Sequence, residues 1–245
     1  MSTVLIIAGS DSSGGAGLTR DVRTLTRFGV RTLCVVTAVT AQSDARVSAV
    51  HVVPAELVHA QMTAALATAP VQAIKIGMLA TRSTVLAVAA TLPAEAPPVV
   101  LDPVLASSSG GELLDAAGCR ALCAELLPRT TLLTPNIPEA AALLGTVTAS
   151  NEAELLQQAR ALLALGPRAV LLKGGHAAGE EASDLLLAAD APPLWLRAPR
   201  MSVTRRGTGC ALSAAIAAGL AAGLELNAAC ERGKQHVIQL LQHDD

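Results

Sequence analysis

Two glycine-rich segments of the sequence are candidate anion-binding sites. In the C-terminal one, Gly207-Thr208-Gly209 precedes Cys210 and a long Ala-rich stretch that predicts a buried helix over residues 210–226. Because a helix N-terminus carries the positive end of the macrodipole, the amides of this turn suit a phosphate undergoing transfer, and the pKa of the Cys210 thiol should be lowered. Cys210 is therefore a candidate general base and the preceding turn a candidate anion hole. A buried structural cysteine is the alternative.

The N-terminal segment covers residues 8–17 and reads AGSDSSGGAG. It has four glycines in nine residues, follows an apolar run and leads into a helical stretch. Glycines allow backbone N–H groups to close on a ligand. The segment matches neither GxGxxG nor GxxxxGK[ST], so a flexible turn is an open alternative to a ligand-binding loop.

Other polar residues directly follow apolar runs, or open the helix that comes next: Asp102, Asn136, Glu139 and Lys173. In an open parallel sheet, ligands bind beyond the carboxyl ends of the strands, so these side chains should converge. Carboxylates, an amide and a lysine suit magnesium and a polyphosphate. Each residue alone has a structural alternative: a turn cap for Asp102, a capping box for Asn136 and Glu139, and a solvated strand end for Lys173.

The elements that must position these residues follow from the alternation of aliphatic runs with amphipathic helical stretches, which indicates an α/β fold with a mostly parallel sheet. Buried strands are predicted at residues 3–8, 32–39, 72–77, 98–102, 131–134 and 169–173. Helices are predicted at residues 18–28, 56–69, 84–92, 116–126, 138–144 and 152–165. Short runs at 184–189 and 194–198 predict an antiparallel edge hairpin. Since no repeat or linker divides the chain, we expect one domain over residues 1–245.

Composition and charge exclude several classes of protein. The 18 Lys and Arg against 20 Asp and Glu give a formal net charge of −2, which supplies no basic surface for nucleic acid. The first apolar run is too short for a signal peptide, and the Ala-rich stretch is broken by Ser213, Gly219 and Gly223. We therefore expect a cytoplasmic protein without a membrane span. The five cysteines show no metal-ligand spacing and predict no disulfide framework.

Seven motifs together resemble those of the hydroxymethylpyrimidine and phosphomethylpyrimidine kinases of thiamine biosynthesis, in the ribokinase-like superfamily. They are AGSDSSGGAG at 8–17, TAQ at 40–42, KIGML at 75–79, LDPV at 101–104, TPNIPE at 134–139, KGGH at 173–176 and GTGCALS at 207–213. The resemblance covers nearly the whole chain. It implies a ribokinase-like three-layer sandwich and phosphorylation of 4-amino-5-hydroxymethyl-2-methylpyrimidine, and of its monophosphate, with ATP and Mg²⁺ as cofactors.

The resemblance also implies the substrate site. The substrate-binding residues would be Gly9, Asp11, Ala16, Gln42, Met78 and Val104. The backbone near Gly9 and Ala16 and the side chain of Gln42 would hold the pyrimidine, with Met78 and Val104 as walls. A glutamine amide can pair with the edge of an aminopyrimidine, which presents a ring nitrogen beside an amino group. A loop glutamine that only supports the backbone is the alternative.

The catalytic and cofactor residues follow in the same way. Cys210 would deprotonate the hydroxymethyl group, and Gly207, Thr208 and Gly209 would form the anion hole. The residues implied for ATP and magnesium are Asp102, Asn136, Glu139 and Lys173, of which Asp102 and Glu139 would hold the metal.

The sequence departs from the family's usual pattern at several positions. Arg206 and Ala211 flank GTGC where the family usually has His and Thr, Ser43 follows TAQ in place of Asn, and Ser108 stands where a lysine is common. We hypothesise that Arg206, or its neighbour Arg205, replaces the missing positive charge by clamping a phosphate, so that its loss would raise KM for ATP or lower activity on the monophosphate. A solvated surface position is the alternative.

Two other functions stay open at this point. A pyridoxine or pyridoxal kinase of the same superfamily phosphorylates a similar ring, but its members tend to lack the TAQ run that contains Gln42. A non-catalytic pyrimidine-binding paralogue is prompted by the altered Arg205–Arg206 segment, whereas intact Cys210 and Lys173 argue against it. The expected partner is a small-molecule substrate, with neither nucleic acid nor membrane, and the edge hairpin favours a homodimer.

Overall fold

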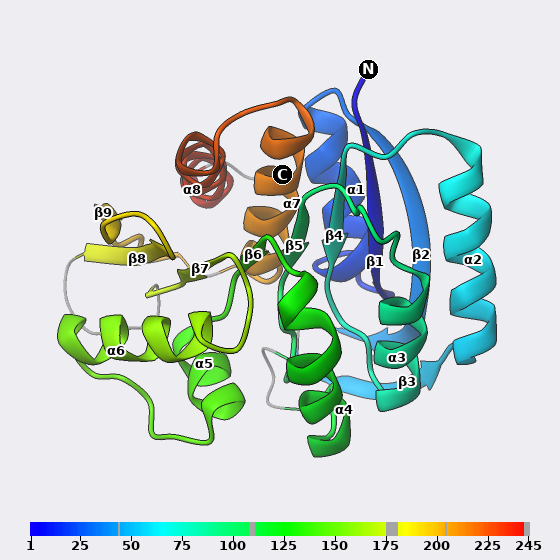
Figure 1. Ribbon diagram of the computed structural model, residues 1–245, viewed down its shortest axis with the longest axis horizontal. Helices are drawn as coiled ribbons and strands as arrows, with labels where there is room; N and C mark the ends of the chain where they lie inside the picture. Colours follow the sequence, from blue (N-terminus) through cyan, green and yellow to red (C-terminus); the bar gives the residue numbers. More distant parts are fainter. Residues whose placement is uncertain (44, 108–110, 175–180, 204, 243–245) are drawn as a thin grey trace.

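A central sheet organises the protein, whose computed structural model describes residues 1–43, 45–107, 111–174, 181–203 and 205–242 (Figure 1). Its strands are β1 (Thr3–Asp11), β2 (Arg31–Gln42), β3 (Val47–Val52), β4 (Ala73–Ile76), β5 (Val99–Leu101), β6 (Leu132–Leu133), β7 (Ala169–Leu172), β8 (Glu181–Ala188) and β9 (Leu194–Pro199). Within the described ranges the strand order is β3-β2-β1-β4-β5-β6-β7-β8-β9. The middle of the sheet is parallel and consists of β2, β1, β4, β5, β6 and β7. Strand β3 at one edge is antiparallel to β2, and β8 and β9 at the other edge are antiparallel to their neighbours.

Helices connect the strands and cover both faces of the sheet. They are α1 (Gly17–Arg27), α2 (Ala55–Thr68), α3 (Arg82–Thr91), α4 (Ala116–Ala121), α5 (Ile137–Leu144), α6 (Glu152–Leu163), α7 (Thr208–Ala221) and α8 (Leu226–Gln242). A π-helical turn η1 (Leu122–Leu126) and a 3-10 turn η2 (Leu127–Arg129) follow α4. Helices α1, α7 and α8 lie on one face, and α2 to α6 lie on the other (Figure 1). The predicted three-layer α/β arrangement with a mostly parallel sheet is confirmed.

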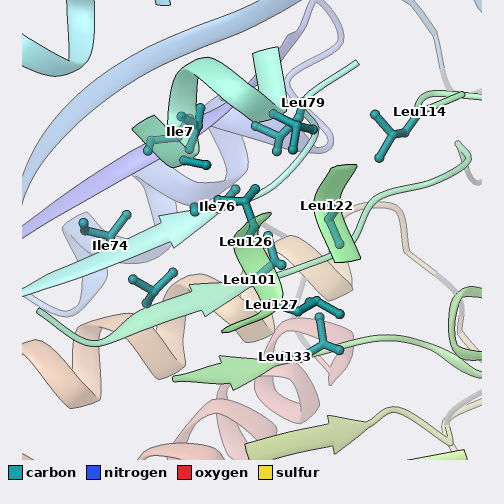
Figure 2. Packing of buried hydrophobic residues seen from close by; sticks show 14 of the residues in the cluster. Ile7, Ile74, Ile76, Leu79, Leu101, Leu114, Leu122, Leu126, Leu127 and Leu133 are labelled. Atoms are coloured by element: carbon teal, nitrogen blue, oxygen red, sulfur yellow. The ribbon is translucent and has the colours of Figure 1, made fainter. Parts of the chain in front are cut away.

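Each face of the sheet has its own hydrophobic core, because the buried strands alternate their side chains between the two faces. Ile74 and Ile76 of β4 pack with helices α2 to α6, in the cluster shown in Figure 2. Leucines of η1 and η2 complete this cluster at Leu122, Leu126 and Leu127. On the opposite face, α7 contributes a run of buried alanines that allows this helix to approach the sheet closely. The glycine turn before α7 is thereby fixed against the carboxyl ends of the strands.

Several predicted boundaries are wrong, each for a physical reason. Strand β3 was not predicted, because its side chains are mostly exposed and it becomes a strand by pairing with β2. The helix predicted at 116–126 changes to a π-turn at Leu122, before the Pro128 that ends it. The helix predicted at 210–226 begins at Thr208 and ends at Ala221, with a separate helix from Leu226.

The predicted edge hairpin is present as β8 and β9. In the described ranges, no helix has both the length and the apolar character that a membrane crossing requires.

Candidate active site

The two glycine-rich segments meet at the carboxyl edge of the parallel strands. Gly207 has φ +74°, and a Cβ atom there would collide with the backbone oxygen of Gly15. The backbone N–H of Gly17 is among the groups that lower the pKa of the Cys210 thiol. The start of α7 therefore lies directly against the loop between β1 and α1, as expected if both belong to one site.

Asp11 organises the N-terminal loop. Its Oδ1 accepts hydrogen bonds from the N–H and the hydroxyl of Ser13, both at 2.9 Å, and its Oδ2 accepts one from the N–H of Ala16 at 3.0 Å. The carboxylate is buried, and both of its oxygens accept hydrogen bonds from the loop. Asp11, predicted to bind substrate, lies where it shapes the loop that carries Gly9 and Ala16.

The predicted substrate residues Gln42, Gly9 and Met78 lie around this loop. Ser12 Oγ is 2.9 Å from both the backbone N and the backbone O of Gln42, which ties the end of β2 to the loop. The side-chain Oε1 of Gln42 is 3.1 Å from Thr40 Oγ1. Gly9 packs against Met78, since a Cβ atom at Gly9 would be 2.8 Å from the Met78 sulfur. These residues line one side of the site.

Met78 also borders a cavity of about 180 Å³ at this edge of the sheet. Val50 and Val52 of β3 line the same cavity, so the strand that sequence reasoning missed helps to shape this part of the molecule. The predicted second wall, Val104, is half-buried and follows Asp102 by two residues. Met78 and Val104, the two predicted walls, thus both lie at this edge of the sheet.

The polar residues that follow β5, β6 and β7 form a second cluster. Lys173 Nζ lies 2.8 Å from Asp102 Oδ1 and 3.9 Å from Glu139 Oε2. Asn136 caps α5 and forms a reciprocal capping box with Glu139. A Cβ atom on Gly209 would lie 3.2 Å from Lys173 Nζ, so the glycine turn passes directly over this cluster. The convergence predicted for these residues is present, and the capping box proposed as an alternative is present with it.

The three ionisable groups of this cluster differ in how strongly they hold a proton. Burial opposes the charge on Asp102, but Lys173 and Lys75 outweigh it and lower the pKa of Asp102. Burial raises the pKa of Glu139 to about 7, since Lys173 is farther away and compensates less. Burial also opposes the charge on Lys173, yet the two carboxylates raise its pKa. Near neutral pH, the cluster holds an ionised Asp102–Lys173 pair beside a partly protonated carboxyl group.

The expected low pKa of Cys210 is wrong. Burial is the largest influence and raises the pKa of the thiol to about 11, against the weaker opposing effects of Lys75 and the Gly17 N–H. The carboxylates of Asp21 and Asp102 raise the pKa further. Desolvation therefore outweighs the position at a helix N-terminus, and the thiol is protonated at neutral pH.

Arg206 lies on the substrate side of the site. Its guanidinium pairs with Asp11 Oδ2 at 2.9 Å, whereas the phosphate-clamp hypothesis places it toward ATP. Ser108 and His176, which also figured in the sequence analysis, lie outside the described residues.

Replacing Gly207 by alanine should separate the two loops. The added methyl group meets the Gly15 carbonyl and also occupies a left-handed conformation, so we expect a loss of stability of at least about 2 kcal/mol. Gly223→Ala is the matched control, because Gly223 has φ +85° and open space around it. It should cost only the conformational strain of about 1–2 kcal/mol. Equal unfolding midpoints in urea for the two variants would contradict the contact between the loops.

Comparison with known proteins identifies the relatives of this chain. The family described as phosphomethylpyrimidine kinase matches residues 11–245. The chain belongs to this family. A hydroxymethylpyrimidine/phosphomethylpyrimidine kinase from Rhizobium meliloti is 45% identical over 236 residues, which cover 95% of this chain and 88% of the relative. The resemblance inferred from the motifs is thus confirmed.

Solved structures agree with this assignment. A phosphomethylpyrimidine kinase from Clostridium difficile matches with a TM-score of 0.84 at 34% identity, covering 98% of this chain and 99% of that one. A pyridoxal kinase from Staphylococcus aureus, in complex with AMP-PCP and pyridoxal, matches with a TM-score of 0.90 at 27% identity, covering 99% and 88%. The phosphomethylpyrimidine kinase fold is therefore shared with kinases that act on another ring.

The phosphomethylpyrimidine kinase motif KIGML contains a residue to which sequence reasoning gave no role. Lys75 is fully buried on β4 and its Nζ lies 2.7 Å from Oδ2 of Asp21 on α1, which is also fully buried. Among the residues that the structure describes, the Asp21 Oδ1 atom is buried and has no hydrogen-bond partner. A lysine between two buried isoleucines was the available signal, since a buried ammonium requires a partner. The pair lies among the groups that influence the pKa of Cys210.

Proposed function

We propose that this chain transfers the γ-phosphoryl group of ATP to the primary hydroxyl of 4-amino-5-hydroxymethyl-2-methylpyrimidine and then to the resulting monophosphate. The observation that carries this proposal is the contact of the two glycine loops, in which Gly207 lies against the carbonyl of Gly15 while Gly209 covers the Lys173–Asp102 pair. A ring held by the first loop would present its hydroxyl group between the thiol and the cationic cluster. The names of the relatives support the substrate.

The residues would act mainly by positioning and electrostatics, as is usual in phosphoryl transfer. Backbone N–H groups of the turn at 207–209 would stabilise charge on the transferred group. Lys173, held between Asp102 and Glu139, would attract the phosphate oxygens. Cys210 would take the hydroxyl proton when in its thiolate form, which is a small fraction at neutral pH. Each role comes from residues that the fold brings to one edge of the sheet.

ATP as phosphoryl donor is supported by the AMP-PCP complex of the related pyridoxal kinase. The donor set also fits magnesium, since Asp102 and Glu139 lie on either side of Lys173 and Mg²⁺ commonly binds through one or two carboxylates together with phosphates. In the described ranges, no group of three or more His, Cys, Asp or Glu gathers as an all-protein metal site. When bound, the ion would neutralise charge on the phosphates.

The direct test is pyrimidine-dependent formation of ADP by the purified protein. We expect turnover with hydroxymethylpyrimidine and with its monophosphate, and none after removal of Mg²⁺ by EDTA. Absence of turnover with both, together with measurable binding of the pyrimidine, would identify a non-catalytic binding protein and overturn the proposal.

A pyridoxine kinase is the second candidate, favoured by the structural similarity to the Staphylococcus aureus enzyme. Gln42 distinguishes the two, because its amide can pair with both groups on the edge of an aminopyrimidine, whereas pyridoxine leaves part of the amide unpaired. Gln42→Leu should therefore lower kcat/KM for hydroxymethylpyrimidine by roughly 5- to 150-fold. Any activity toward pyridoxine should change little.

Steady-state kinetics with both rings decides this prediction. Equal losses on the two substrates would mean that Gln42 supports the loop through Ser12 and does not read the ring. Ser12→Ala, which removes that support and leaves the amide, is the matched control.

We further propose that the chain acts as a homodimer and unfolds as one domain. The proposal for the dimer is motivated by the edge hairpin β8–β9, since exposed sheet edges favour burial against another chain. We expect sedimentation equilibrium to give the mass of a dimer, and calorimetry to show a single unfolding transition.

A further inference from the structure

Arg206 connects three segments of the candidate substrate site. One guanidinium nitrogen, Nη2, lies 2.9 Å from Asp11 Oδ2 in the N-terminal loop. The other, Nη1, donates to the backbone oxygen of Ser43 at 2.8 Å and lies 3.3 Å from Ser13 Oγ. Arg206 itself immediately precedes the turn that starts α7. One side chain therefore bridges the loop after β1, the end of β2 and the catalytic turn.

The arginine is well placed to hold these segments rigidly. Its side chain is 15% exposed and that of Asp11 is 4% exposed, so the ion pair is largely shielded from water. Charge-assisted bonds of this kind are stronger than neutral ones, and the planar guanidinium serves several acceptors at fixed angles. Asp11 in turn binds the N–H groups of Ser13 and Ala16.

The segments that Arg206 bridges are those expected to read the pyrimidine ring. Ser43 directly follows Gln42, and Asp11 ends β1, two residues after Gly9. The loop that follows β1 contains Gly14 and Gly15, and a glycine-containing loop loses much conformational freedom when it becomes ordered around a ligand. An interaction that orders the loop beforehand lowers this cost and so strengthens substrate binding.

From this geometry we propose that Arg206 is a positioning residue for the ring-binding loop, acting through Asp11 and Ser43, and that it sets the affinity for the pyrimidine. The proposal rests on the proposed function for the identity of the ligand. It replaces the hypothesis that Arg206 clamps a phosphate of ATP, because the guanidinium charge is already paired with a buried carboxylate.

Steady-state kinetics of Arg206→Gln and Arg206→Lys test the proposal. For Arg206→Gln we expect KM for hydroxymethylpyrimidine to rise about 10-fold or more, with KM for ATP within about 2-fold of the original value. For Arg206→Lys, KM for hydroxymethylpyrimidine should lie between that of the original protein and that of Arg206→Gln, because an ammonium group keeps the charge but cannot bond two segments as a planar guanidinium does. Arg197→Gln is the matched control: it breaks an exposed ion pair with Glu152 at the far sheet edge and should change neither KM.

The coupling to Asp11 is tested by a double-mutant cycle. If Arg206 acts through Asp11, adding Arg206→Gln to Asp11→Asn should cost less than about 3-fold beyond Asp11→Asn alone. If the double variant instead shows the product of the two single-variant losses, Arg206 does not act through Asp11.

Hydrogen exchange supplies a readout that does not depend on activity. The amides of residues 11–17 should exchange faster in Arg206→Gln than in the original protein and in Arg197→Gln. If this loosening occurs but no pyrimidine is phosphorylated, the proposed function fails and the positioning role stands. A rise in KM for ATP alone, or unchanged exchange and unchanged KM values, would overturn the inference.

Discussion

Replacing Cys210 by alanine should lower kcat for hydroxymethylpyrimidine by roughly 10²- to 10⁴-fold, the range typical of losing a general base. The thiol lies at the start of α7, where the two glycine loops meet, and Gly17 is among the groups that influence its pKa. Because the proposal assigns the binding of the ring to other residues, KM for the pyrimidine should change little. Stopped assays of ADP formation with saturating ATP measure both constants.

Cys230→Ala is the matched control for this experiment. Cys230 is a buried thiol whose pKa is raised like that of the half-buried Cys210, but it lies on α8 in the core that α8 shares with α7. Its replacement should lower stability through the cavity that it leaves, with kcat unchanged. If Cys210→Ala also keeps its kcat, the thiol is a packing residue and the hydroxyl proton leaves by another route.

The pH dependence of kcat/KM should reflect the ionisation of the same thiol. Since burial raises the pKa of Cys210 to about 11, only a small fraction is thiolate at pH 7, and this fraction rises tenfold per pH unit. If the thiolate is the base in the free enzyme, kcat/KM for the pyrimidine should increase along this slope between about pH 7 and 9. A flat profile in the original protein would exclude a free thiolate as the rate-determining base.

The sequence was sufficient to predict the parallel core and the convergence of the site. Runs such as residues 3–8 are buried on both faces and almost wholly apolar, as expected of a central parallel strand. Asp102, Asn136 and Lys173 follow three such runs, so their meeting at one edge is a consequence of topology. The residue types at that edge then indicated anion chemistry.

Features that depend on long-range contacts were beyond sequence reasoning. Strand β3 has mostly exposed side chains and exists through its pairing with β2, so its own pattern carried little signal. The partner of Arg206 is Asp11, 195 positions earlier in the chain. The pKa of Cys210 was mispredicted because position at a helix N-terminus can be seen in a sequence, whereas the degree of burial cannot.

The buried pair of Lys75 and Asp21 leads to the second large effect. Lys75→Met should lower the free energy of unfolding by about 3–5 kcal/mol at pH 8, because it leaves the carboxylate of Asp21 buried and unpaired. Urea unfolding monitored by circular dichroism gives this value. Lys75→Met with Asp21→Leu should recover most of the loss, since two apolar residues of similar volume replace both charges. A double variant no more stable than Lys75→Met would show that the site cannot repack.

The loss of stability in Lys75→Met should depend on pH in a defined direction. Burial already raises the pKa of Asp21 from its ordinary 3.8 to about 6, with Lys75 as the main group opposing that rise. Removing the ammonium must raise this pKa further, so the folded variant binds a proton that the unfolded chain releases above about pH 4. The free energy of unfolding of Lys75→Met should therefore fall as the pH rises from about 4 through the raised pKa, by about 1.4 kcal/mol per unit. The variant should lie closest to the original protein at pH 5, and an equal loss at pH 5 and pH 8 would mean that packing of the lysine stem, and not its charge, is what stabilises this part of the fold.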